Sequence, residues 1–249
     1  MYENKINLID EYRQKIDNFR PLSTDILSQL KAYYKVSLTY TSNALEGNSL
    51  TLTETKIIIE DGITIGGKPM KDHLEVLGHS DAYDLLYELA NNREISEKEI
   101  LQLHHLFYKS INEEKAGVYR DCNVIITGSE FELPKYKDVP KLMKEFSDNI
   151  PKMKEQYHPV EFAARLHEKF VTIHPFVDGN GRAARLLMNL SLLQSGYNIT
   201  IIPPVVRNDY IVALQEAQIN NNREPFVNFI SEMVLESQKE YLKIIERLS

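Results

Sequence analysis

A helix, a polar loop and a second helix are predicted between residues 159 and 196, and this arrangement constrains the fold more than any other feature of the chain. Apolar residues recur every three or four positions over 159–173, which is typical of one buried helical face. A second helix is expected over 182–195, with Gly196 as its C-terminal stop. Because the glycine-rich stretch between them follows a helix and not a strand, a dinucleotide-binding βαβ unit is excluded.

The loop and the start of the second helix, residues 174–185, read His-Pro-Phe-Val-Asp-Gly-Asn-Gly-Arg-Ala-Ala-Arg. Arg182 and Arg185 fall in the first helical turn, where free backbone N–H groups and the helix dipole already make the potential positive. Two cations at this place indicate that an anion binds there. Gly179 and Gly181 would let the backbone approach that anion closely, as a polyphosphate site requires.

Two further residues of the loop suggest reactive chemistry. His174 is the candidate general base, because an imidazole titrates near neutral pH. Asp178 is the candidate ligand of Mg²⁺, which usually takes one or two carboxylates together with substrate phosphate oxygens. An ordinary interhelix turn, whose arginines pair with surface acids, is the alternative that fits this dense polar segment less well.

A second irregular helix end is expected far upstream. Apolar spacing predicts a helix over 24–46, and Gly47 can end it. Ser42 and Glu46 lie one turn apart on one face, and a glutamate in the last turn opposes the helix dipole. The simplest interpretation pairs Glu46 with Arg185 when no phosphate is bound. The alternative is a solvated glutamate at a frayed helix end.

Composition limits the class of protein. The 249 residues are 43% hydrophobic and 26% charged, as expected for a soluble globular chain with one sizeable core and a small subdomain. The net charge of −7 argues against DNA binding, and neither a signal peptide nor a membrane span is expected. Cys122 is the single cysteine, which favours a reducing cytoplasm. The β-branched stretch 124–133, with a turn at Gly128, predicts a short β-hairpin.

The segment 174–185 resembles the signature of the Fic family, His-Pro-Phe-x-Asp/Glu-Gly-Asn-Gly-Arg-x-x-Arg, and meets every fixed position. Most Fic proteins are AMP transferases that move adenylate from ATP onto a hydroxyl side chain of a target protein. Their fold is an all-α bundle with one short β-hairpin. The resemblance implies that His174 deprotonates the target hydroxyl and that Asp178 binds Mg²⁺. It also implies that five residues contact the phosphates of ATP, namely Gly179, Asn180, Gly181, Arg182 and Arg185. Arg185 would bind the γ-phosphate.

The upstream segment 42–47 resembles the family's inhibitory motif, Ser/Thr-x-x-x-Glu-Gly/Asn, from the class that carries it N-terminal to the core. In that class the glutamate pairs with the second arginine of the signature and prevents productive ATP binding. The resemblance therefore implies an inhibitory set of Ser42, Glu46 and Gly47.

Two more regions can be matched to the family. The expected hairpin follows a Gly-Val-Tyr-Arg stretch at 117–120 and resembles the Fic flap, here about 122–134, which docks the target by strand addition. Its residues nearest to ATP would be Thr127, Gly128 and Ser129. The adenine pocket would be closed by Tyr210, Ile211 and Gln218, although helical core positions explain Tyr210 and Gln218 equally well.

These observations predict an all-α chain with an N-terminal helical region over 1–95 and a Fic core over 96–249. The function expected is an autoinhibited protein adenylyltransferase that uses ATP and Mg²⁺ and modifies a protein hydroxyl, on a partner or on itself. Removal of AMP with the help of Glu46, transfer of another phosphate-containing group, and ATP sensing without turnover stay open as alternatives. Self-association is frequent in the family, which leaves a homodimer open.

Overall fold

The computed structural model describes residues 2–91 and 94–249, and no β-strand occurs in these two ranges. The helices are α1 (Tyr2–Asp17), α2 (Thr24–Ala44), α3 (Leu52–Asp61), α4 (Met70–Ala90), α5 (Glu97–Tyr108), α6 (Val139–Gln156), α7 (Pro159–Ile173), α8 (Asn180–Gln194), α9 (Arg207–Ile219) and α10 (Glu224–Leu248). Short 3₁₀ turns are Glu113–Lys115, Tyr136–Asp138 and Pro204–Val206. The all-α prediction is confirmed.

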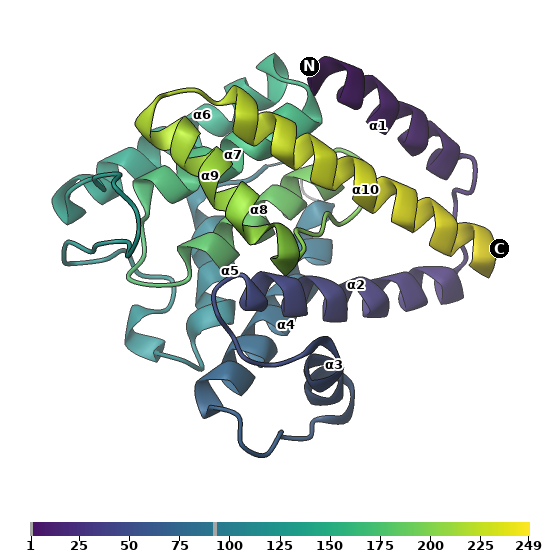
Figure 1. The fold of residues 1–249 in the computed structure, drawn as a ribbon, viewed down its shortest axis with the longest axis horizontal. Helices are drawn as coiled ribbons and strands as arrows, with labels where there is room; N and C mark the ends of the chain where they lie inside the picture. The colour runs from purple at the N-terminus through teal and green to yellow at the C-terminus, as the bar shows by residue number, and fades with distance from the viewer. Residues whose placement is uncertain (1, 92–93) are drawn as a thin grey trace.

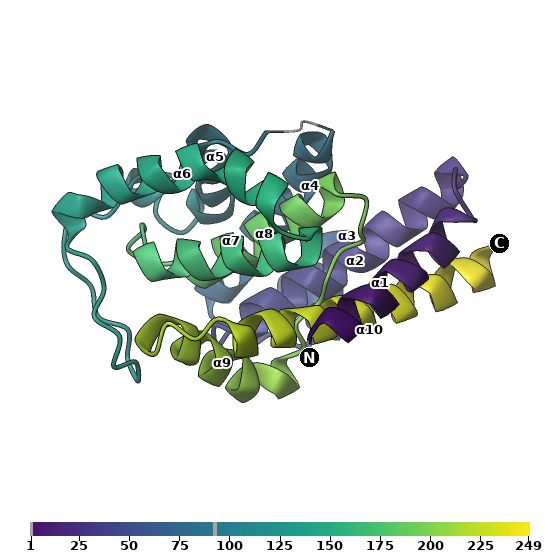
Figure 2. The ribbon, with the colours of Figure 1, turned by 90° about the horizontal axis from the view of Figure 1, so that it is seen from above.

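The predicted helix–loop–helix forms the centre of the molecule. Helices α7 and α8 pack against each other, and α8 is buried along most of its length. Helices α4 and α5 pack on α8 from one side, and α9 and α10 cover α7 from the other. The long helix α10 runs beside α1, so that the N-terminal and C-terminal helices pair (Figures 1 and 2).

Capping boxes mark the starts of two helices. Thr51 and Glu54 form a capping box at α3, and Ser96 and Glu99 form one at α5. Gly196, at φ 81°, lies just after α8 and provides the predicted stop. Two boundaries differ from expectation. Helix α2 ends at Ala44, and Glu46 lies in the following turn; helix α8 begins two residues before Arg182.

The predicted β-hairpin at 124–133 is wrong. The structure has a turn closed by the Ser129 N–H donating to the Ile126 carbonyl at 3.1 Å, but no strand ladder. Ile125 is 94% exposed, so its side chain packs on no core. Two isolated strands without a hydrophobic face are only marginally stable, which explains why β-branched composition did not produce a hairpin here. The segment extends from the bundle as a loop (Figure 2).

No helix in the described part of the chain combines the length and hydrophobicity that crossing a membrane would require. Cys122 is a free, exposed thiol. The proposed division at residue 95 stays a prediction.

Candidate functional site

A cavity of about 340 Å³ brings together residues from four distant parts of the sequence. The sequence-predicted members of its wall are Glu46, Thr127, Gly128, Ser129, His174, Gly181, Tyr210, Ile211 and Gln218. Ile126, Val171, Arg207, Leu214 and Gln215 complete the lining. The loop 126–129, the residues after α2, the start of α8 and helix α9 therefore line one cavity. The ATP contacts expected of the loop and of α9 stay predictions.

His174 is the C-cap of α7 and adopts the left-handed conformation, with φ 53° and ψ 60°. This conformation is uncommon for a residue other than glycine and turns the chain sharply into the polar loop. Arg120 holds the turn in place, because its Nε donates to the His174 carbonyl at 2.8 Å. Burial lowers the pKa of His174 to about 4, and the Arg120 charge acts in the same direction. The imidazole is therefore neutral at pH 7 and can accept a proton.

Arg120 also joins this turn to the 122–134 loop. Its guanidinium donates to the carbonyls of Cys122 and Pro134, at the two ends of that loop. One buried side chain thus positions the flap relative to His174. The sequence signal for this role was the Gly-Val-Tyr-Arg stretch, but the reasoning from sequence gave the arginine no function.

The loop after His174 is closed by Asn180. Its side-chain oxygen accepts from the Phe176 N–H, and its amide donates to the Phe176 carbonyl, both at 2.9 Å. Beneath the loop, His104 accepts from the Gly117 N–H at 2.9 Å and therefore donates through Nε2 to the Asp178 carbonyl at 3.1 Å. No residue pattern in the sequence predicts these contacts of His104, because its partners are backbone atoms.

Asp178 is placed where a cation can reach it. Its side chain is exposed, with one oxygen accepting from the Gly179 N–H at 2.6 Å and the other lying 3.7 Å from the Lys71 ammonium. Among the described residues no cluster of three or more His, Cys, Asp or Glu side chains could hold a metal ion. One exposed carboxylate fits Mg²⁺ that is held mainly by phosphate oxygens and water.

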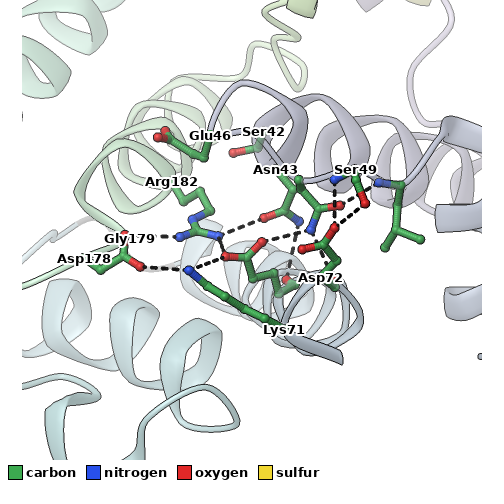
Figure 3. A network of polar contacts seen from close by, with 12 residues as sticks. Ser42, Asn43, Glu46, Ser49, Lys71, Asp72, Asp178, Gly179 and Arg182 are labelled. Carbon is green, nitrogen blue, oxygen red and sulfur yellow. Dashed lines mark hydrogen bonds and ion pairs between the residues drawn. The ribbon is translucent and has the colours of Figure 1, made fainter. Parts of the chain in front are cut away.

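Arg182 points away from the cavity, toward α4. Its guanidinium lies 2.7 Å from the Glu75 carboxylate and donates to Asn43 Oδ1 at 3.3 Å (Figure 3). It also stacks over the Phe107 ring at 4.4 Å. The whole side chain is buried. A phosphate contact for Arg182 stays a prediction, since its side chain does not line the cavity.

Arg185 is bound by the end of α2. Its Nε donates to Ser42 Oγ at 3.0 Å, and its Nη2 donates to the Ser42 carbonyl at 2.8 Å and to Glu46 Oε1 at 2.7 Å. Nη1 lies 3.5 Å from the Tyr210 hydroxyl, which also contacts His167 Nε2 at 2.9 Å. The expected pairing of the inhibitory segment with the second arginine is present in the geometry.

Glu46 occupies the space at the start of α8. A Cβ on Gly181 would overlap the Glu46 carboxylate, so that glycine is what allows the close approach. Burial raises the pKa of Glu46, but the Arg185 charge, the hydrogen bond from Arg185 and the Arg182 charge together outweigh it, and the net pKa is lowered. Although the Glu46 side chain is 36% exposed, it belongs to the cavity wall, so this surface faces the cavity. Its carboxylate is ionised at neutral pH and sits where the sequence predicted a phosphate.

Two residues of the cavity wall that the sequence did not indicate connect its parts by hydrogen bonds. Arg207 donates from Nε to the Leu45 carbonyl at 2.8 Å, which joins the start of α9 to the end of α2. The Gln215 amide donates to the Gly128 carbonyl at 3.3 Å, which joins α9 to the loop. Both partners are again backbone carbonyls, which sequence patterns do not reveal.

Comparison with known proteins agrees with this geometry. The Fic/DOC family matches residues 94–192. The protein adenylyltransferase Fic of Nematostella vectensis is 35% identical over 232 residues, 92% of this chain and 53% of that relative. The Drosophila grimshawi protein of the same name is 33% identical over 96% of this chain and 49% of its own length. The chain thus spans about half the length of the curated relatives it matches.

Solved structures share the fold. A Fic-1 structure from C. elegans superposes with a TM-score of 0.87 at 30% identity, over 100% of this chain and 74% of that one. A Fic domain containing signaling protein from Bacteroides thetaiotaomicron superposes with a TM-score of 0.88 at 28% identity, over 96% and 97% of the two chains. With a complete signature between His174 and Arg185 and a fold shared along its full length, this chain belongs to the Fic/DOC family.

Proposed function

We propose that this chain is a protein adenylyltransferase that moves AMP from ATP to a hydroxyl side chain of a protein, and that Glu46 inhibits it. The observation that carries the proposal is the ion pair of Arg185 with Glu46, a residue that lines the same cavity as His174. A base, a helix N-terminus and a removable carboxylate thus lie around one space. Proteins that are similar to this chain over most of its length are named protein adenylyltransferases.

In the transfer, His174 takes the proton of the attacking hydroxyl. The hydroxyl oxygen forms a bond to the α-phosphorus of ATP, the bond to the β-phosphate oxygen breaks, and pyrophosphate leaves. The backbone N–H groups of Asn180 and Gly181 would face the developing negative charge at the start of α8, while that of Gly179 donates to Asp178. Mg²⁺, held through Asp178, would neutralise phosphate charge when bound. The protein contributes mainly position and charge, as phosphoryl chemistry requires.

Inhibition follows from competition for Arg185. A γ-phosphate and the Glu46 carboxylate are both anions that the same guanidinium would bind, and the buried Arg185 has room for one of them. Glu46 is covalently attached and already in place, so ATP must displace it. Removing this carboxylate should favour ATP by about 1.5–3 kcal/mol, the value of a hydrogen bond between charged groups, or about 10- to 100-fold.

The test is labelling of a cell lysate, and of the chain itself, with tagged ATP and Mg²⁺. We expect Glu46→Gly to raise labelling 10- to 100-fold and Glu46→Gly combined with His174→Ala to abolish it. Glu60→Gly, which removes an exposed glutamate from α3, is the matched control and should leave labelling at the level of the unchanged chain. Equal labelling by the Glu46→Gly and unchanged forms would refute the inhibition. Tight ATP binding by Glu46→Gly with no labelled protein would refute the transfer and leave ATP sensing.

A further inference from the structure

A second and larger cavity, of about 690 Å³, shares no residue with the first. The N-terminal half of α2 supplies Leu27, Leu30, Lys31 and Tyr34, and the α1–α2 connection and the segment after α8 supply residues 20–22 and 196–199. The connection lies at the right of Figures 1 and 2, and the 122–134 loop lies at the left. The large cavity is therefore at the end of the molecule opposite the flap.

Its size and wall suit a small molecule with an apolar body. Binding sites for such molecules commonly measure about 300–1,000 Å³ and are lined by aliphatic and aromatic side chains with a few polar groups. Four tyrosines line this one, Tyr34, Tyr87, Tyr197 and Tyr241, together with leucines and one isoleucine. Apolar surface makes up most of the lining, so burial of an apolar ligand would drive binding.

The charge of the wall selects an anion. Arg20 and Lys31 are its charged residues, and no carboxylate lines it, although the chain as a whole carries a net charge of −7. Arg20 is partly neutralised by Asp17, at 3.0 Å. Lys31 pairs with no carboxylate of the described residues, and its ammonium stands over the Tyr87 ring at 4.3 Å. A positive charge beside an apolar space has the chemistry to hold a carboxylate.

From its size, its apolar wall and the charge of Lys31 we propose that the large cavity is a binding site for an amphiphilic carboxylic acid, with its apolar body among the leucines and tyrosines and its carboxylate at Lys31. The ligand class follows from the wall alone. The proposal does not depend on adenylyl transfer or on Glu46, since neither cavity uses a residue of the other.

The experiment uses 4-benzoylbenzoate, a photoreactive aromatic carboxylate, and uncharged benzophenone as its matched probe. The full chain is irradiated with each probe, and crosslinked peptides are identified by mass spectrometry. We expect saturable labelling by the carboxylate within 20–34 or 193–199, about tenfold stronger than by benzophenone. Lys31→Gln should reduce that preference at least fivefold. Lys35→Gln, one turn further along α2 and paired with Asp84 outside the cavity, should leave it unchanged.

Excess ATP distinguishes the two cavities. We expect ATP to leave labelling unchanged, because the proposed site is remote from the 340 Å³ cavity. Labelling that ATP suppresses, that maps to 126–129 or 207–218, or that spreads over the surface would overturn the proposal. So would equal labelling by the two probes, or a Lys31→Gln protein that keeps the preference for the carboxylate.

Discussion

Arg182 and Arg185 lie one turn apart on α8, and each has a carboxylate partner at 2.7 Å, yet the two pairs differ in exposure. Glu75, the partner of Arg182, is 7% exposed, whereas Glu46, the partner of Arg185, is 36% exposed and faces a cavity. The two ion pairs therefore have the same N–O distance but different surroundings. The Arg182 pair is sealed within the protein, and the Arg185 pair is open to a competing anion.

The surroundings extend this contrast. Asn43 binds Arg182 and also donates to the Glu75 carbonyl, so the Arg182 pair belongs to a closed network between α2, α4 and α8 (Figure 3). Arg185 keeps the two hydrogen bonds that it donates to Ser42 if Glu46 moves away. The first pair is expected to hold the helices together, and the second is expected to respond to a ligand.

The largest effect should come from breaking the sealed pair. Glu75→Ala removes the nearer carboxylate of a buried guanidinium and leaves it Asp178, at 3.5 Å and 42% exposed, and we expect a loss of about 3 kcal/mol in the free energy of unfolding. Urea denaturation followed by circular dichroism measures it. Arg182→Met combined with Glu75→Leu is the control, because replacing both charges with apolar groups should cost much less than removing one. A loss below about 1 kcal/mol for Glu75→Ala would mean that the pair is not sealed.

Breaking the open pair should affect ligand binding more than stability. Glu46→Gln keeps the size and an oxygen acceptor for Arg185 but removes the charge. We expect unfolding to change by no more than about 1 kcal/mol, because Ser42 still binds Arg185. ATP affinity, measured by calorimetry with Mg²⁺, should rise about tenfold, or about 1.4 kcal/mol. The opposite pattern, large destabilisation without a gain in ATP affinity, would make Glu46 a structural residue.

The dependence of the labelling rate on pH tests the role of His174, which lines the same cavity as Glu46. Because the pKa of His174 is lowered to about 4, the neutral form should be fully present at pH 6–8 and lost as the pH falls through 4. For the Glu46→Gly form, we expect a labelling rate that is flat between pH 8 and about 5 and then falls up to tenfold per pH unit. Circular dichroism at each pH controls for unfolding. An inflection near 6.5, the ordinary histidine value, would show that burial does not govern this imidazole.

Sequence reasoning succeeded where one motif carries its own geometry. The loop at 174–185 could be predicted from the helical periodicity on both sides of it, and the pairing of Glu46 with Arg185 could be predicted because charges that oppose a helix dipole are recognisable in a sequence. The 122–134 loop could not, since β-branched composition predicts strands only when a packed face supports them. Ile125 has no such face.

The network around Arg182 could not be predicted from the sequence either. Glu75 lies on α4, more than a hundred residues from Arg182, and nothing in its local sequence distinguishes it from a surface glutamate. His104, Arg120 and Gln215 act on backbone carbonyls near the site, which any residue provides. Contacts of this kind depend on the assembled fold and leave no spacing pattern to read.

The smallest effect is expected at Lys71, which links the sealed network to the catalytic loop. Its ammonium lies 3.6 Å from Glu75 and 3.7 Å from Asp178, and its side chain is 58% exposed. Exposed ion pairs contribute little, so Lys71→Ala should change the free energy of unfolding by less than about 0.5 kcal/mol.

Removing a cation beside Asp178 should strengthen Mg²⁺ binding, seen as roughly a twofold lower Mg²⁺ requirement for labelling by the Glu46→Gly form. Lys56→Ala, which removes an equally exposed lysine from α3, should leave that requirement unchanged. If Lys71→Ala raised the Mg²⁺ requirement, the lysine would be supporting the site and not competing for its carboxylate.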